Sequence, residues 1–291
     1  MRIPLPKTTL EILTLTNLVL VKHTADGANS PLTNIVDMAN LSAQHLVAQT
    51  MYDRRKLLAA QAKQHNEARD NALGKSNLMP AGVPDTVLFL IHKTLNIVKA
   101  AHLNEPNLWA SWGFDVQTSS YIIWKDANGV RVPKTAAGAT PHSSKPAARV
   151  KIPTGTTELI ALANGIVAKH AADGAASPLN NVVDVVLLAN KAQFAQSEDA
   201  LATQLQNDSE TAREARDIAI WGDSLTHTTK IVGSIMHDLT RVQKTLLAIY
   251  PSTPHRLGDW GFTVNAPAHK KPKTTPTPPP NTPPNNPGNP T

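Results

Sequence analysis

Apolar and polar positions follow a helical period in the first stretch of the chain. After Thr8, apolar residues recur at three- and four-residue spacing, at Ile12, Leu15, Val19 and Leu20. Thr8 and Glu11 have the spacing of a capping box, in which each side chain satisfies a free backbone donor of the first turn. Gly27 can supply the left-handed residue that ends a helix. The pattern therefore predicts an amphipathic helix that begins after Thr8 and ends before Gly27.

Two long stretches without proline or glycine follow, at residues 32–73 and 179–220. Each predicts one helix of about forty residues, roughly 60 Å long at 1.5 Å per residue. The Ser-Pro pair before each stretch suits a helix start, because serine caps the first turn and proline needs no backbone donor there. Gly74 and Gly222 are expected to end these helices. The third helix of each set is expected at about 84–102 and 224–250.

These helices belong to a sequence that occurs twice. The segment at 22–32 returns at 169–179, an offset of 147 residues, with the shared pattern Lys-His-x-Ala-Asp-Gly-Ala-x-Ser-Pro-Leu. A closing signature, Trp-Gly-Phe-x-Val, occupies 112–116 and 260–264, an offset of 148 residues. A tandem duplication with one net inserted residue explains both offsets.

The duplication sets the expected domain organisation. Each copy has its own caps, helices and closing aromatic segment, and each is long enough to bury a core. We therefore expect an all-α protein of two tandem antiparallel helical bundles, with three main helices each, at residues 1–116 and 150–265. A β-hairpin and flexible basic linker at 117–149 and a disordered tail rich in Pro, Asn and Thr at 266–291 complete the expected order.

The linker carries apolar and aromatic residues on both sides of an Asn-Gly pair. Residues 120–124 and 130–132 predict two short strands, and Asn128-Gly129 has the sequence of a tight hairpin turn. Residues 135–148 show no such pattern and predict a flexible connection.

The repeated turn motif allows two interpretations. A lysine and a histidine before Ala-Asp-Gly are typical of a helix terminus, where cations suit the negative end of the helix dipole. A ligand-binding role for the histidine and the aspartate is the alternative. Retention in both copies does not separate these interpretations, because a structural turn would be retained too. The residues concerned are His23, Asp26, Gly27, His170, Asp173 and Gly174.

The closing Trp-Gly-Phe signature also allows two interpretations. Its tryptophan can fold back and plug the end of a helical bundle, because a buried indole contributes a large apolar area. Alternatively, the aromatic residues form an exposed site where a partner docks. The candidate binding residues of the signatures and the linker are Trp112, Phe114, Trp260, Phe262, Tyr121 and Trp124.

Composition narrows the classes of function. The chain has no cysteine, which excludes disulfides, thiolate metal sites and a cysteine nucleophile. Its net charge of +6 gathers outside the helical copies, because residues 117–151 hold six cations and one anion, and the tail holds Lys270, Lys271 and Lys273. Solvated flexible segments explain such charge, and binding to phosphates is the alternative.

The sequence lacks the common motifs for catalysis, metal binding and cofactor binding. The sequence Gly-Asp-Ser-Leu at 222–225 is that of an esterase signature, but it follows a predicted helix and lacks a downstream Asp-x-x-His. No His-Glu-x-x-His, Glu-x-x-His, phosphate loop or dinucleotide fingerprint occurs. No stretch approaches the ~20 apolar residues of a membrane span, and the first residues do not form a signal-peptide pattern. We expect a cytoplasmic protein, or one in an assembly built there, without metal or cofactor.

Three segments together resemble a set of uncharacterised bacterial helical proteins: Ile152-Pro153, the turn motif at 169–179, and Leu257-Gly258-Asp259-Trp260-Gly261-Phe262. The likeness covers both copies, outside the linker and the tail. The second copy fits better, because the first has Trp109-Ala110-Ser111 where the second has Leu-Gly-Asp. The resemblance implies a helical fold and implies no activity and no catalytic residues.

The sequence favours a non-enzymatic structural or binding protein. Two similar bundles suggest a bivalent scaffold or adaptor, for example a subunit of a larger bacterial assembly with a protein partner. The alternative is a protein associated with nucleic acid or another polyanion through its basic linker and tail. The sequence sets no oligomeric state.

Overall fold

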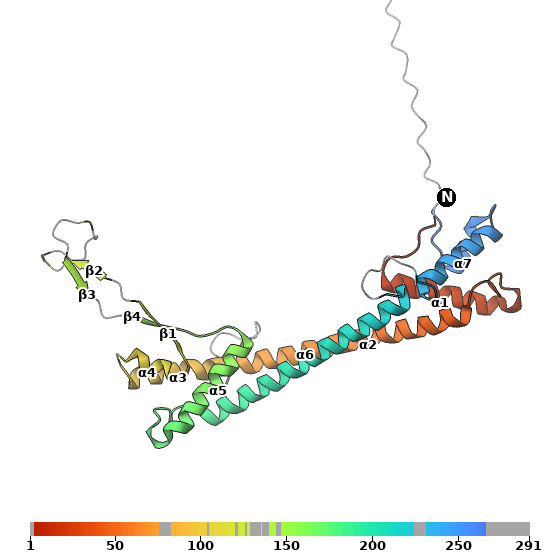
Figure 1. Ribbon diagram of the computed structural model, residues 1–291. Coiled ribbons are helices and arrows are strands. Elements are labelled where there is room, and N and C mark those ends of the chain that lie inside the picture. Colours follow the sequence, from red (N-terminus) through yellow and green to blue (C-terminus); the bar gives the residue numbers. More distant parts are fainter. Residues whose placement is uncertain are drawn as a thin grey trace, which may run out of the picture. The chain divides into compact units, whose positions relative to one another are not determined.

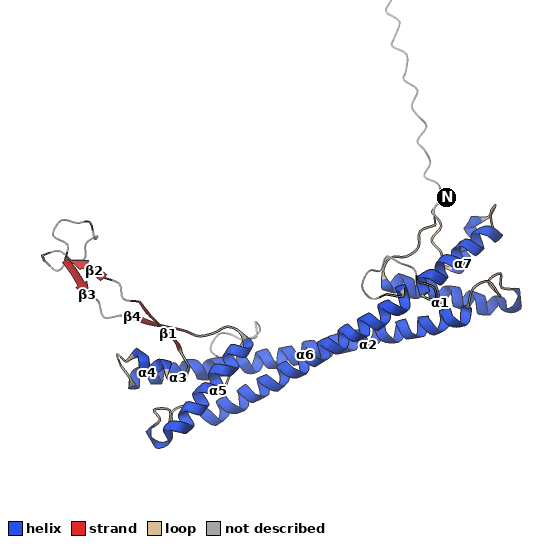
Figure 2. Cartoon of the chain, viewed as in Figure 1, coloured by secondary structure: helices blue, strands red, loops and turns tan. Residues whose placement is uncertain are grey.

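The computed structural model confirms a mostly helical chain (Figures 1 and 2). It describes residues 3–75, 83–103, 105–119, 122–125, 127–128, 135, 140–143, 147–223 and 231–265. The expected tail at 266–291 therefore lies outside the described residues.

Each copy contributes a similar series of helices. The first copy forms α1 (Thr9–Asp26), η1 (Gly27–Asn29), α2 (Met38–Leu73), α3 (Val87–Ala101) and α4 (Pro106–Ala110). The second copy forms α5 (Thr156–Asp173), η2 (Gly174–Ala176), α6 (Val185–Trp221), α7 (Ile235–Ile249) and η3 (Pro254–Trp260). The capping box at Thr8 and Glu11 is present, and Gly74 and Gly222 follow the ends of the long helices as predicted.

The two long helices begin later than the Ser-Pro pairs predict. In each copy an asparagine interrupts the helical backbone, with φ of 60° at Asn34 and at Asn181. Asparagine is one of the few residues that tolerates this left-handed region. The helices then start after Asp37 and Asp184, whose carboxylates accept backbone hydrogen bonds from the third following residue at 2.9 and 2.8 Å. These aspartates, and not the serines, therefore cap α2 and α6.

The third helices are also capped by hydroxyl groups. The Thr86 hydroxyl accepts from the backbone N–H of Phe89 at 3.3 Å, so α3 begins within three residues of its predicted start. The Ser234 hydroxyl accepts from the backbone N–H of His237 at 3.3 Å. Helix α7 therefore starts at Ile235, later than the predicted 224, and residues 224–230 lie outside the described part of the chain.

The linker forms strands, but their pairing differs from the predicted hairpin. The strands are β1 (Asp115–Ser119), β2 (Ile122–Lys125), β3 (Thr140–Ser143) and β4 (Ala147–Lys151). Strand β2 is close to the expected 120–124, yet its antiparallel partner is β3, which lies in the segment expected to be flexible. The expected partner at 130–132 and Gly129 of the expected turn lie outside the described residues.

The pairing of β1 with β4 explains this register. The two strands are antiparallel, with Val116 opposite Val150, and both valines pack against the helical core. Burial of these two valines therefore fixes the strand register where the linker joins the helices. The next pair, Ile122 opposite Ser143, continues almost the same register, so the local Asn-Gly signal does not set the pairing.

Helices from both copies make up each of two compact units. Among the described residues, those of the first unit lie within Met1–Gln49 and Asp217–Thr291, and those of the second lie within Thr50–Arg216. In the first unit α1 packs against α7 and η3, and in the second α3 packs against α5 (Figure 1). The compact units therefore differ from the tandem bundles expected at 1–116 and 150–265.

The exchange between the copies is reciprocal. Helix α1 of the first copy packs against α7 of the second, and α5 of the second copy packs against α3 of the first.

Each unit has an apolar core of conventional composition. In the second unit the core includes Val87, Ile91 and Val98 of α3 with Leu159, Leu162 and Ile166 of α5. In the first unit the buried residues include Ile12, Leu15 and Val19 of α1 with Leu239, Val242 and Leu246 of α7. Full burial of each such side chain stabilises the fold by about 1.5–3 kcal/mol. Because each core is built from helices of both copies, its stability depends on both.

Candidate functional site

The repeated turn motif forms a helix terminus held by side chains. In the first copy the Lys22 ammonium and the Asp26 carboxylate lie 2.6 Å apart, one turn from each other on α1. His23 Nδ1 lies 2.6 Å from the Ser30 hydroxyl, which joins the end of the helix to the loop that follows. Gly27 has a positive φ of 51° and ends the helix. These contacts match the structural interpretation of the motif.

The second copy repeats this arrangement. The Lys169 ammonium lies 2.5 Å from the Asp173 carboxylate, and His170 Nδ1 lies 2.7 Å from the Ser177 hydroxyl. Gly174 again ends the helix, with φ of 50°. The motif therefore builds the same turn twice.

A serine hydroxyl beside a histidine can also act as a nucleophile with its base, provided that a substrate can reach the hydroxyl. The Ser30 side chain is buried, and its oxygen also accepts a long hydrogen bond of 3.4 Å from the backbone N–H of Leu32. Ser177 is buried in the same way and accepts from Leu179 at 3.3 Å. Both serines thus stabilise a turn and are not presented to a substrate.

The closing tryptophans are buried rather than displayed. Trp112 and Trp260 are each 2% exposed, as a plug at the end of a bundle requires. The phenylalanines of the signatures, Phe114 and Phe262, are buried as well. In this structure none of the four offers an exposed docking surface.

The two aromatic residues of the linker are Tyr121 and Trp124. Tyr121 lies outside the described residues, and Trp124 is part of β2, with its side chain outside the described part of the chain.

The buried tryptophan of each copy meets the turn motif of the other copy. The Lys22 ammonium lies 5.8 Å from the ring centroid of Trp260, and the Lys169 ammonium lies 5.9 Å from that of Trp112. A cation at this distance from an indole face is attracted to it. The two signatures, far apart in the sequence, are therefore two parts of one structural feature in each unit.

Each unit also carries a groove beside its turn-forming helix. The groove of the first unit, here called the α1 groove, has a volume of 720 Å³ and is lined by Pro4, Leu5, Pro6, Lys7, Thr8, Leu10, Glu11, Thr14, Leu15, Leu18, Gly261 and Thr263. The groove of the second unit, the α5 groove, has a volume of 510 Å³ and is lined by Gly113, Asp115, Lys151, Pro153, Thr154, Glu158, Ala161, Leu162 and Gly165.

The two grooves occupy equivalent places in the repeat. Six lining residues of the α5 groove, at 153, 154, 158, 161, 162 and 165, each lie 147 positions after a lining residue of the α1 groove. The glycines of the closing signatures, Gly113 and Gly261, also line corresponding walls. The groove is therefore a property of the repeated unit.

The lining of the two grooves differs in polarity. The α1 groove presents Leu10, which is 58% exposed, and the exposed Leu18. The second copy has Thr157 and Gly165 at the corresponding positions. Because the fold tolerates a threonine and a glycine there, Leu10 and Leu18 are not required for the core.

One carboxylate at the α1 groove is held in its charged form. The Glu11 side chain accepts a hydrogen bond from the backbone N–H of Thr8 at 3.2 Å, at the start of α1. Hydrogen bonds to Thr8 and Lys7 lower the pKa of Glu11 below its usual value. Together with Lys7, it gives the rim of an apolar groove one charge of each sign.

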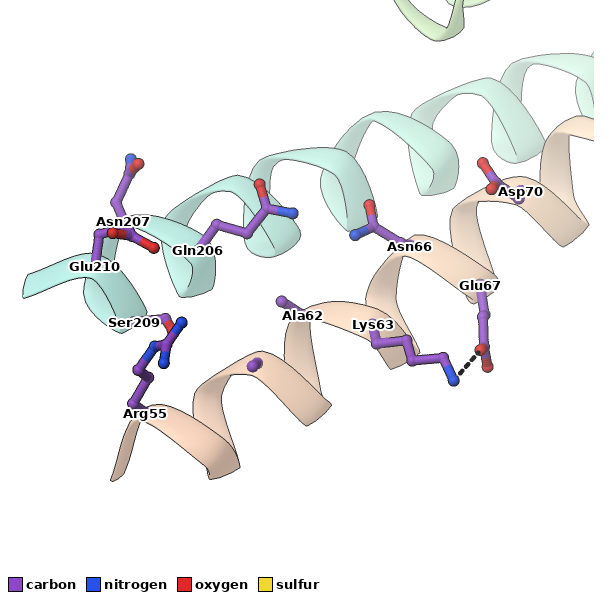
Figure 3. Close-up of a pocket in the computed structure, with 11 residues that line it drawn as sticks. Arg55, Ala62, Lys63, Asn66, Glu67, Asp70, Gln206, Asn207, Ser209 and Glu210 are labelled. Carbon is purple, nitrogen blue, oxygen red and sulfur yellow. Dashed lines mark ion pairs between the residues drawn. The ribbon is translucent and has the colours of Figure 1, made fainter. Parts of the chain in front are cut away.

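A third groove lies between α2 and α6 within the second unit (Figure 3). It has a volume of 690 Å³ and is lined by Arg55, Ala59, Ala62, Lys63, Asn66, Glu67, Asp70, Gln206, Asn207, Ser209 and Glu210. Figure 3 shows an ion pair along its wall, in which the Lys63 ammonium lies 3.7 Å from the Glu67 carboxylate. Charges of both signs line it, so it forms no uniform field for an anion or a cation.

The same helices are joined by partly buried polar contacts that sequence reasoning did not identify. Arg69 donates to Asp199 of α6 at 2.7 Å and pairs with Asp70 at 2.9 Å. Burial lowers the pKa of Arg69, but hydrogen bonds to both carboxylates outweigh it and raise the pKa overall. His65 Nδ1 lies 2.7 Å from the Glu198 carboxylate. The Arg-Asp pair was visible in the sequence, whereas its partner across the helices was not.

The described part of the chain contains no cluster of three or more His, Cys, Asp or Glu residues that could hold a metal ion. Among the same residues, no helix is both long enough and apolar enough to cross a membrane. Gly222 and Asp223 of the esterase-like sequence follow α6, whereas Ser224 lies outside the described residues. Comparison with protein-family models, curated proteins and solved structures finds no match to this chain.

Proposed function

We propose that the protein is a non-enzymatic, bivalent helical scaffold that binds segments of protein partners in the α1 and α5 grooves. The observation that carries this proposal is the presence of equivalent grooves in both units. A repeated groove allows one chain to hold two ligands, which raises overall avidity when both are engaged.

The different linings support two different ligands. The α1 groove combines exposed leucines with a rim formed by Lys7 and Glu11, and this suits a peptide segment with apolar side chains. The α5 groove has Asp115, Lys151 and Glu158 among its lining residues, so it suits a more polar segment. This difference supports the proposal of an adaptor that joins two unlike partners.

Selection from a displayed library of random peptides on the immobilised full chain tests the proposal. We expect enriched sequences with apolar side chains that bind the α1 groove. The Leu10→Asp variant should weaken binding of these peptides at least about tenfold, because it places a charge in an apolar contact. Leu57→Asp is the matched control, since Leu57 is 59% exposed on α2 and lines none of the three grooves. Equal binding by both variants, or no enriched peptide, would argue against the α1 groove as a binding site.

The second candidate function is association with a polyanion. Arg149 and Lys151 are exposed and alternate along β4, which puts both side chains on one face of the strand. A salt titration of binding to a generic DNA duplex distinguishes the two candidates. The scaffold proposal predicts no measurable binding at physiological salt, whereas affinity that falls steeply with salt would favour the polyanion.

A further inference from the structure

We infer that the two duplicated signatures are complementary halves of one self-recognition element, so that the binding partner of each copy is another copy of the same repeat. This inference does not depend on what the α1 and α5 grooves bind. It rests on contacts between elements of different copies within each compact unit.

In the first unit, α1 contacts the closing signature of the second copy. The ammonium of Lys22 faces the buried ring of Trp260. Gly261 follows with a positive φ of 86°, and a Cβ added to it would lie 2.7 Å from Leu18 Cδ1 and 3.3 Å from Leu15 Cδ1. The backbone therefore approaches the side chains of α1 more closely than a larger residue allows.

The second unit shows the same contact with the copies interchanged. Lys169 of the second copy faces the buried ring of Trp112 of the first. Gly113 also has φ of 86°, and a Cβ added to it would lie 3.3 Å from Leu162 Cδ1. Leu162 is the counterpart of Leu15 in the repeat. A lysine, a leucine, a tryptophan and a glycine thus recur at equivalent positions on both sides.

Further polar contacts join the copies in each unit. In the first unit the Asn40 side chain donates to Asp238 at 3.1 Å, and Arg241 donates to the backbone carbonyl of Ile35 at 2.7 Å. In the second unit Lys75 donates to Thr156 at 3.3 Å, besides the ion pair of Arg69 with Asp199. In each unit, the association of the two copies therefore involves more than the lysine–tryptophan contact.

A copy without its complement would expose an apolar face. The buried face of α1 includes Ile12, Leu15 and Val19, and it is covered in part by the third helix and the closing segment of the other copy. Among the described residues, the third helix that packs on α1 is α7, which belongs to the other copy. Association between copies is therefore the way in which each copy buries its core, whether or not a linker joins them.

Cleavage of the folded full chain between the copies tests this inference. A protease site inserted after the exposed Thr135 allows the linker to be cut while both copies are present. We expect the two fragments to co-migrate as one soluble species with the mass of the uncut chain, in sedimentation and in size-exclusion chromatography. Separation of the fragments, or precipitation of either one, would overturn the inference.

A second measurement tests the role of the signatures themselves. In the cut protein, the combined change Trp112→Ala and Trp260→Ala should raise the Kd of the two fragments by about 100-fold or more, because each unit loses a buried aromatic contact between copies. Phe194→Ala is the control, because Phe194 is a large apolar residue exposed on α6. If the tryptophan variant and the control have the same Kd, the long helices alone hold the copies together and the signatures are not recognition elements.

Discussion

The ammonium of Lys22 lies 5.8 Å from the ring centroid of Trp260, although 237 residues separate them in the chain. The attraction itself is modest, about 0.5–1 kcal/mol for an exposed cation over an aromatic ring. Burial of the indole contributes considerably more, because the ring removes on the order of 200 Å² from water. The tryptophan should therefore matter much more for stability than the lysine that covers it.

Trp260→Ala in the full chain should lower the free energy of unfolding by about 3–5 kcal/mol, the usual cost of truncating a buried aromatic residue. Denaturant unfolding measures the change, with Phe194→Ala as the exposed aromatic control. Removal of Trp260 at a cost below about 1 kcal/mol would contradict its role as a plug and restore the docking interpretation of the signature.

The equivalent glycines of the two signatures provide a matched comparison. Gly113→Ala and Gly261→Ala both force a side chain onto a left-handed backbone, at a cost of about 1–2 kcal/mol. At Gly261 the added Cβ also meets Leu18 at 2.7 Å, whereas at Gly113 the nearest atom is 3.3 Å away. Gly261→Ala should therefore be the more destabilising change in denaturant unfolding. Equal costs would mean that α1 does not approach this glycine so closely.

The sequence predicted local structure well because local signals determine it. Apolar periodicity, the Thr8–Glu11 box and the glycine stops placed most helices, and the repeated motif forms the helix terminus that was one of its two interpretations. The start of α2 was wrong because serine before proline is a strong cap signal. In the structure, the left-handed backbone at Asn34 forms a turn after this pair. The helix then starts at the later cap, Asp37.

The partners of each helix could not be predicted in the same way. Periodicity indicates which face of α1 is apolar, but it does not say which copy covers that face. Duplication makes the third helices of both copies equally suitable by composition. The contacts α1 with α7 and α5 with α3 distinguish the two arrangements, and no local sequence pattern encodes these contacts. The long-range partners of Arg69 and of β2 were missed for the same reason.

His45 should make the stability of the first unit depend on pH. Its Nδ1 is buried without a hydrogen-bond partner among the described residues, and burial lowers the pKa of the imidazole. The groove around it is lined by uncharged residues, namely Asn17, Leu20, Val21, Thr24, Ala25, Ser42, Leu46 and Gln49. No carboxylate of the described residues lines this groove, so none acts from there to raise the pKa of His45 again.

The sign follows from the lowered pKa. The unfolded chain binds a proton at His45 more readily than the folded chain, so this contribution to stability is complete above the ordinary histidine value of 6.5 and is lost as the pH falls below it. His45→Ala, which copies Ala192 at the equivalent position, should reduce the loss of stability between pH 7 and pH 5. Unfolding measured across this range checks the prediction, and an unchanged pH dependence in the variant would contradict it.

The isolated second copy gives the sharpest distinction between exchanged and independent bundles. Residues 150–265 expressed alone lack α3, which packs against α5, and α1, which packs against α7 and η3. In a pair of such fragments, Leu162 and Lys169 of one molecule can take the places of Leu15 and Lys22 beside Trp260 of the other. We therefore expect a dimer whose midpoint of thermal unfolding rises with protein concentration, because association and folding are linked. A monomer that unfolds cooperatively at the same temperature at every concentration would show that each copy closes its own core, and the exchange seen between α1, α5 and the third helices would then be unnecessary for folding.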